Sequence, residues 1–148
     1  MRALILDPGH MTGWALFHEE NLIAQGVISG GRDGFIEWTK TQMPDHDVLV
    51  VESFIVEPSF VGRADASEVV GAAFALSPAP VKREQLRSRK ISLVRTKNEA
   101  GRFAWLREQG FEGMSHELDA ITHGLLYLRA IGHRAAFERY WGTKKPRG

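Results

Sequence analysis

Short apolar runs bounded by turn residues predict the strands of this chain. The first three runs predict an antiparallel meander over residues 2–7, 13–18 and 22–29. The unbroken run Val48-Leu49-Val50-Val51 is typical of a strand covered on both faces, in the parallel part of a sheet. We expect a fifth strand over 91–94, preceded by a short basic helix.

Longer segments between these runs predict helices. We expect them over residues 35–42, with Asp33 as the N-cap, and over 66–76, 98–108 and 115–131, the last extending toward Tyr140. The order of elements describes an α/β fold, a five-stranded mixed sheet with helices on both faces. A length of 148 residues fits one domain spanning 1–148, with a basic tail from about 141.

Composition excludes several kinds of chemistry. The chain has no cysteine, which excludes disulfides, thiolate zinc sites and cysteine nucleophiles. No apolar run is long enough to cross a bilayer and the N-terminus lacks the features of a signal peptide, so we expect a cytoplasmic protein without a membrane partner. Residues 1–79 carry a net charge of −7 and residues 80–148 one of +8. This asymmetry favours an acidic pocket beside a basic surface, as an enzyme acting on a polyphosphate requires; solvated helix faces are the alternative.

Two acidic residues follow buried strands. Asp7 ends the first run and leads into Pro8-Gly9, and Glu52 directly follows Val48–Val51. If the first and fourth strands are neighbours, the two carboxylates emerge side by side. Each also has a structural interpretation, since Asp7 can cap its own turn and Glu52 can cap the loop that follows.

The last predicted helix offers two more candidates. His116, Asp119 and His123 follow the i, i+3, i+7 spacing and therefore share one helix face. A helix packed across the strand ends would add His116 and Asp119 to the acids. Alternatively, Asp119 is a first-turn acid favoured by the helix dipole, His116 a helix-start or core histidine, and His123 structural.

Carboxylates that converge without bases between them repel one another and raise at least one pKa. Divalent cations remove that conflict, and oxygen ligands with one imidazole suit Mg²⁺ or Mn²⁺. Two such ions about 3.5–4 Å apart would activate a water and stabilise the leaving oxygen of a phosphodiester.

The blocks Asp7-Pro8-Gly9, Thr12-Gly13-Trp14-Ala15, Val50-Val51-Glu52 and His116-x-x-Asp119-Ala120 resemble those of RuvC-type Holliday junction resolvases, in the RNase H-like superfamily. The chain looks most like their compact phage-encoded members. The resemblance implies a homodimer that nicks four-way DNA junctions with Mg²⁺ or Mn²⁺. It implies that Asp7, Glu52, Asp119 and His116 are the catalytic and metal-binding residues.

The resemblance also gives other segments expected roles. Helix 66–76 would form the dimer contact, and Phe54 or Phe60 would insert at the junction crossover, with a core position as the alternative. Arg63 and Lys97 would contact phosphate, or are solvated charges. The chain is shorter than the cellular enzymes, and the turn before Thr12 is more like the phage version. This favours relaxed action on forks and flaps as well as junctions, in the host cytoplasm if the protein is phage-encoded.

Two other functions remain open. The Asp-x-Gly…Thr-Gly opening is also typical of actin-like ATPases and sugar kinases, although those enzymes place two such domains around one nucleotide. A non-catalytic DNA-binding module would need no more than the basic second half.

Overall fold

The computed structural model describes residues 1–53, 64–96 and 98–142. Its centre is a five-stranded sheet in the order β3-β2-β1-β4-β5. The strands are β1 (Arg2–Asp7), β2 (Thr12–His18), β3 (Asn21–Ile28), β4 (Val48–Ser53) and β5 (Val81–Leu86). The pairs β1–β2 and β2–β3 are antiparallel, and the pairs β1–β4 and β4–β5 are parallel. The predicted mixed sheet is confirmed.

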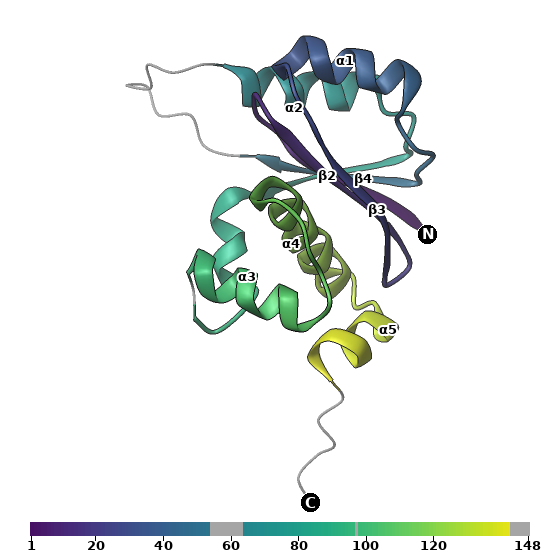
Figure 1. Cartoon of the computed structure of the whole chain (residues 1–148). Helices are drawn as coiled ribbons and strands as arrows, with labels where there is room; N and C mark the ends of the chain where they lie inside the picture. Colours follow the sequence, from purple (N-terminus) through teal and green to yellow (C-terminus); the bar gives the residue numbers. More distant parts are fainter. Residues whose placement is uncertain (54–63, 97, 143–148) are drawn as a thin grey trace, which may run out of the picture.

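Helices cover both faces of this sheet (Figure 1). One layer holds α1 and α2, and the other holds α3 and α4, with the C-terminal turns beside α4. The helical elements are α1 (Gly31–Thr41), α2 (Asp65–Leu76), the 3₁₀ turn η1 (Arg87–Ser92), α3 (Glu99–Glu108), α4 (Ser115–Ala130), α5 (Arg134–Ala136) and the π-helical turn η2 (Phe137–Trp141).

Alternate residues of the same strands build two separate cores. On β1, Ala3 and Ile5 face α3 and α4, whereas Leu4 and Leu6 face α1 and α2. All four side chains are almost fully buried. Successive side chains of a strand point to opposite faces of the sheet, so a strand between two helical layers must be apolar at every position. The central strands are therefore held from both sides, and the residues that follow them are firmly placed.

The predicted fifth strand at 91–94 is wrong. The fifth strand is β5, and η1 follows it, which reverses the predicted order of helix and strand. β5 lies at the sheet edge, where four of its six residues are exposed and three are charged, so it lacks the apolar run that marks a buried strand. Leu93, from the run that suggested a strand, is instead buried in the core beneath α3 and α4.

Two helix ends also differ from the prediction. α1 begins at Gly31 with Gly30 as its N-cap, and Asp33 lies in the first turn without capping it. Gly30 has φ 92° and Gly31 φ 58°, left-handed values that glycine adopts without strain. α4 ends at Ala130 and does not continue to Tyr140, because Gly132 (φ 69°) reverses the chain before α5.

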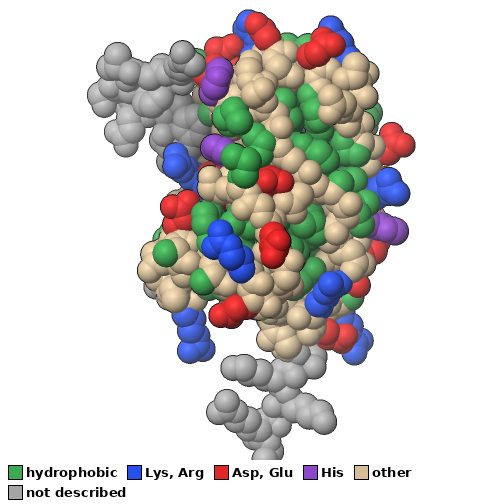
Figure 2. All heavy atoms as spheres, viewed as in Figure 1, with side chains coloured by type: hydrophobic (Ala, Val, Ile, Leu, Met, Phe, Trp, Pro, Cys, Tyr) green, Lys and Arg blue, Asp and Glu red, His purple; other side chains and the backbone are tan. Residues whose placement is uncertain are grey.

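The opposite charges of the two halves of the chain do not separate on the face seen in Figure 2. Lys and Arg side chains there are interspersed with Asp and Glu, and exposed hydrophobic side chains lie between them. Within the described part of the chain, none of the helices has the length and apolar character needed to cross a membrane.

Candidate active site

Asp7 and Glu52 lie at the same end of two adjacent strands. The parallel register of β1 and β4 pairs Leu6 with Val51, so the next residue on each strand is one of the two acids. This confirms that the first and fourth strands are neighbours. Asp7 is 9 % exposed and Glu52 is 4 % exposed, which is far below the usual exposure of ionised carboxylates.

The first turn of α4 lies close against β2. A Cβ atom added to Gly13 would lie 2.0 Å from the backbone oxygen of His116, so glycine is what permits this approach. Gln25 of β3 also fixes the start of the helix, because its Nε2 donates hydrogen bonds to Oε2 of Glu117 (2.7 Å) and to the carbonyl of Glu112 (2.8 Å). These contacts place His116 with its Nδ1 3.5 Å from Oδ2 of Asp7.

Asp119 lies one turn further along α4 and is bound by two basic side chains. Arg102 of α3 donates from a terminal nitrogen to Oδ1 at 2.8 Å. Nζ of Lys90, from η1, lies 3.3 Å from Oδ2. Both carboxylate oxygens are thus engaged by cations that are themselves nearly buried.

Lys90 also reaches the strand carboxylates. Its Nζ lies 3.1 Å from Oε1 of Glu52, so one ammonium bridges Glu52 and Asp119. Arg87 of the same turn is more exposed, with Nε 3.9 Å from Oε1 of Glu52. Basic side chains therefore lie among the acids, so the acids do not converge on their own. The ammonium offsets part of the repulsion among the acids.

His123 also borders the site, on the helix face that it was predicted to share with His116 and Asp119. Its Nε2 lies 3.7 Å from Oε2 of Glu52. The imidazole is fully buried, and neither ring nitrogen has a hydrogen-bond partner among the residues that the structure describes. Its spacing of seven from His116 was the available signal.

The two strand carboxyls have opposite pKa shifts. Burial, the hydrogen bond with Glu52 and the negative charges of Glu52 and Asp119 raise the pKa of Asp7 to about 9. Burial also opposes ionisation of Glu52, but the neighbouring His123, the hydrogen bond from Asp7 and the Lys90 ammonium outweigh it and lower the Glu52 pKa. The two neighbouring carboxyls therefore differ in their preference, with Asp7 favouring its protonated form and Glu52 its ionised form.

All four predicted site residues line one pocket of about 490 Å³. The turn from Pro8 to Met11, Ala66 of α2, Arg87 and Lys90 complete its wall. The other candidates, Phe54, Phe60, Arg63 and Lys97, lie outside the described residues.

The donor set suits a hard divalent cation, since it offers three carboxylates and one imidazole. Oε2 of Glu52 is buried and has no hydrogen-bond partner within the described part of the chain. The side chains are not arranged as a closed ligand shell, because no three His, Asp or Glu residues among those described converge on one ion position. The Lys90 ammonium lies where Glu52 and Asp119 would share a cation.

No sequence model of a known protein family matches this chain, and no curated protein matches it. Solved structures do. RuvC of Thermus thermophilus matches with a TM-score of 0.57 and 13% identity, over 90% of this chain and 98% of its own. The fold is that of RuvC.

The same Thermus thermophilus protein in complex with a Holliday junction substrate matches with a TM-score of 0.57 and 14% identity, over 90% of this chain and 97% of that one. The Holliday junction resolvase of fowlpox virus matches with a TM-score of 0.52 and 13% identity, over 88% and 99%. At these identities the likeness concerns the fold.

Proposed function

We propose that this protein is a divalent-metal-dependent endonuclease that hydrolyses phosphodiesters in branched DNA. The observation that carries the proposal is the pocket that collects Asp7, Glu52, His116 and Asp119 at the ends of β1, β4 and the start of α4. A pure DNA-binding surface gains nothing from buried acids that face phosphates. The RuvC fold and its junction-resolving relatives support branched DNA as the substrate class.

Asp7, Glu52, His116 and Asp119 are the residues that would hold Mg²⁺ or Mn²⁺, and their side chains would have to turn toward the ion, because no three of them converge on one position in the metal-free structure. Such ions activate a water molecule and stabilise the oxygen that leaves the phosphodiester. Because the pKa of Asp7 is raised, cation binding at this pair would be coupled to the release of a proton. Lys90 must leave Asp119 before a second ion can bind there.

The basic residues of η1 have a role in binding DNA. Arg87 lines the pocket and has a largely exposed side chain, so it can contact a backbone phosphate beside the acids. Arg102 is nearly buried and contacts Asp119, which makes it a positioning residue for that carboxylate.

The test is cleavage of synthetic four-way, forked and linear duplex DNA with Mg²⁺ or Mn²⁺. We expect nicking of branched DNA in preference to linear duplex. Asp7→Asn should abolish nicking and leave junction binding nearly unchanged, because the two side chains have the same shape. Undiminished cleavage by this variant would remove Asp7 from the site.

We further propose that the protein is a homodimer formed through α2. Gly71 and Ala75 are exposed on this helix, and a Cβ at Gly71 would meet no atom within 4 Å among the described residues outside the helix's own backbone. Small exposed residues permit close approach of a second helix. Gly71→Glu should therefore leave the fold intact and shift the protein to a monomer in analytical ultracentrifugation; an unchanged dimer would exclude this face.

A non-catalytic DNA-binding module is the second candidate, and the engagement of Asp119 by Lys90 and Arg102 favours it. Both candidates predict binding of branched DNA. Calorimetric titration with Mn²⁺ separates them, since only the nuclease should bind the ion, and Asp7→Asn should weaken that binding.

A further inference from the structure

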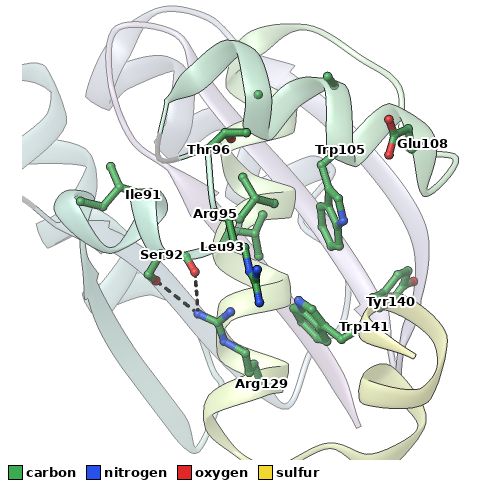
Figure 3. A pocket seen from close by; sticks show the side chains of 13 residues that line it. Ile91, Ser92, Leu93, Arg95, Thr96, Trp105, Glu108, Arg129, Tyr140 and Trp141 are labelled. Carbon is green, nitrogen blue, oxygen red and sulfur yellow. Dashed lines mark hydrogen bonds between the residues drawn. The ribbon is translucent and has the colours of Figure 1, made fainter. Parts of the chain in front are cut away.

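A second and larger cavity lies on the far side of η1 and α3 from the acidic pocket. Its volume is about 890 Å³, within the range of small-molecule sites. None of the four acidic-site candidates lines it. Figure 3 shows that its walls come from residues 91–96, α3, the end of α4 and the C-terminal turn η2.

One wall of this cavity is aromatic. The rings of Trp105 and Trp141 are stacked, with centroids 6.2 Å apart and planes 26° from parallel. Tyr140 meets Trp141 edge-on at 6.2 Å. The indole Nε1 of Trp141 is buried and has no hydrogen-bond partner among the described residues. The wall therefore offers extended π-faces together with one unused donor.

The side next to this wall is cationic. Arg129 donates to the carbonyl and the hydroxyl of Ser92 at 3.2 Å, and its guanidinium lies 5.6 Å from the Trp141 ring centroid. Arg95 lies on the same side of the two tryptophans in Figure 3. Within the described part of the chain, neither arginine forms an ion pair with an acid, although Glu108 also lines the cavity. Burial and the nearby charge of Arg89 lower the pKa of Arg129, as expected where cationic groups crowd together.

We propose that this cavity binds one unpaired nucleotide of DNA, with its base against Trp105 and Trp141 and its phosphate at Arg95 and Arg129. A base supplies the aromatic face that the indoles can stack on, and a phosphate supplies the missing negative charge. Base and phosphate oxygens also supply acceptors for the indole Nε1. An acidic peptide would satisfy the arginines and leave the stacked indoles unused.

The cavity shares two elements with the acidic pocket. On η1, Lys90 faces the acids while Ile91 and Ser92 line the cavity. On α3, Arg102 contacts Asp119 while Trp105 lines the cavity. The nucleotide site itself does not depend on catalysis. Its role, which is to hold an unpaired strand beside the cut, rests on the proposed nuclease function.

The test is binding of a fluorescein-labelled ten-residue oligothymidylate to the full chain in EDTA, measured by anisotropy. We expect Arg129→Gln and Trp105→Leu each to weaken binding by about tenfold, as the loss of a stacking or phosphate contact does. Arg134→Gln removes one positive charge from an exposed residue outside the cavity and should change affinity less than twofold. Trp105→Phe keeps an aromatic face and should restore most of the binding.

Two further measurements, thermal unfolding and binding of duplex DNA, keep the outcomes distinct. Thermal unfolding excludes loss of fold in Trp105→Leu, and Arg129→Gln tests the same site without altering the core. Blunt duplex DNA should bind the cavity variants within twofold of wild type; an equal loss on duplex would mean a general phosphate contact and overturn the proposal. Unchanged oligothymidylate affinity in both cavity variants would overturn it as well.

The acidic-site variant Asp7→Asn separates this site from the proposed nuclease. It should bind oligothymidylate as wild type does. If no cleavage is seen with any DNA while the cavity variants still lose binding, the nuclease proposal fails and the nucleotide site stands. If Asp7-dependent cleavage is present and the cavity variants bind normally, the nucleotide site fails alone.

Discussion

The ammonium of Lys90 lies 3.1 Å from Oε1 of Glu52, where a metal-dependent nuclease would be expected to hold a cation. The same ammonium contacts Asp119 at 3.3 Å. The acidic pocket therefore contains its own positive charge, which stabilises the metal-free protein and competes with any ion that uses both carboxylates.

Replacing this charge should strengthen metal binding. We expect Lys90→Met to raise the affinity for Mn²⁺ by about tenfold, because a repulsive charge within about 4 Å of the ion contributes on the order of 1–4 kcal/mol. Calorimetric titration measures both affinity and stoichiometry. We expect one ion for the wild type and two for the variant, in which Asp119 loses one of its two basic partners.

Arg87→Gln is the matched control, since it removes a more distant and exposed charge. It should change Mn²⁺ affinity by less than threefold. Two ions bound by the wild type would show that Lys90 leaves readily and would contradict its role as a competing cation.

Asp7→Asn should stabilise the metal-free protein at high pH. The folded-state pKa of Asp7 is raised from 3.8 to about 9, so the stability that its proton supports is present below pH 4 and is lost as the pH rises toward 9. Asparagine keeps a donor toward Glu52 without titrating. We expect a gain of about 2 kcal/mol at pH 8, shrinking toward pH 5.

Urea unfolding in EDTA from pH 5 to pH 9 measures this difference. Asp33→Asn, on an exposed acid in α1, is the control and should show no comparable growth with pH. A constant difference across the range would mean that Asp7 ionises normally in the folded protein.

The sequence was sufficient to predict the adjacency of the two strand acids. Apolar runs that end in Asp7 and Glu52 are local patterns, and a mixed sheet with β1 beside β4 brings their ends together. The placement of His116 beside Asp119 was also predictable, because residues three apart share a helix face.

The basic half of the site was not predictable in this way. Lys90 reaches the pocket from the 3₁₀ turn η1, which follows the polar edge strand β5. Neither element has a strong hydrophobic pattern, so the sequence does not reveal where Lys90 lies. Arg102 did carry a signal, since it lies one turn before the buried Leu106 on α3. A charged residue on the buried face of a helix indicates a partner, here Asp119, although the pattern does not identify it.

Gly13→Ala should disturb the site by displacing the start of α4. The added methyl group would lie 2.0 Å from the His116 carbonyl oxygen and 2.8 Å from its Cβ, so α4 must move away from β2. We expect a loss of about 1–3 kcal/mol of stability, as in other overpacked cores. Cleavage should fall by about a hundredfold, because a displacement near 1 Å can cost that much.

Thermal unfolding and junction cleavage are the two measurements for this variant. Gly71→Ala adds the same methyl group on α2, where no atom of the described residues outside the helix's own backbone lies within 4 Å, and it should not reduce the stability of the single chain, measured at a concentration too low for dimer formation. Wild-type cleavage by Gly13→Ala would show that the position of His116 is not critical.

Glu19→Gln should lower stability without affecting cleavage. Glu19 lies just beyond the end of β2 that is opposite the site and accepts hydrogen bonds from the N-terminal ammonium and from Nε2 of His133, the latter at 2.8 Å. These bonds lower the pKa of Glu19 from 4.5 to about 2. Its contribution to stability is therefore present above pH 4.5 and is lost as the pH falls toward 2.

Because the Glu19 side chain is 44% exposed, we expect a loss of only about 1 kcal/mol at pH 7 in urea unfolding. Glu20→Gln is the control, because the neighbouring carboxylate of Glu20 makes no such contacts in the described structure. An equal loss in both variants would refute a specific role for Glu19.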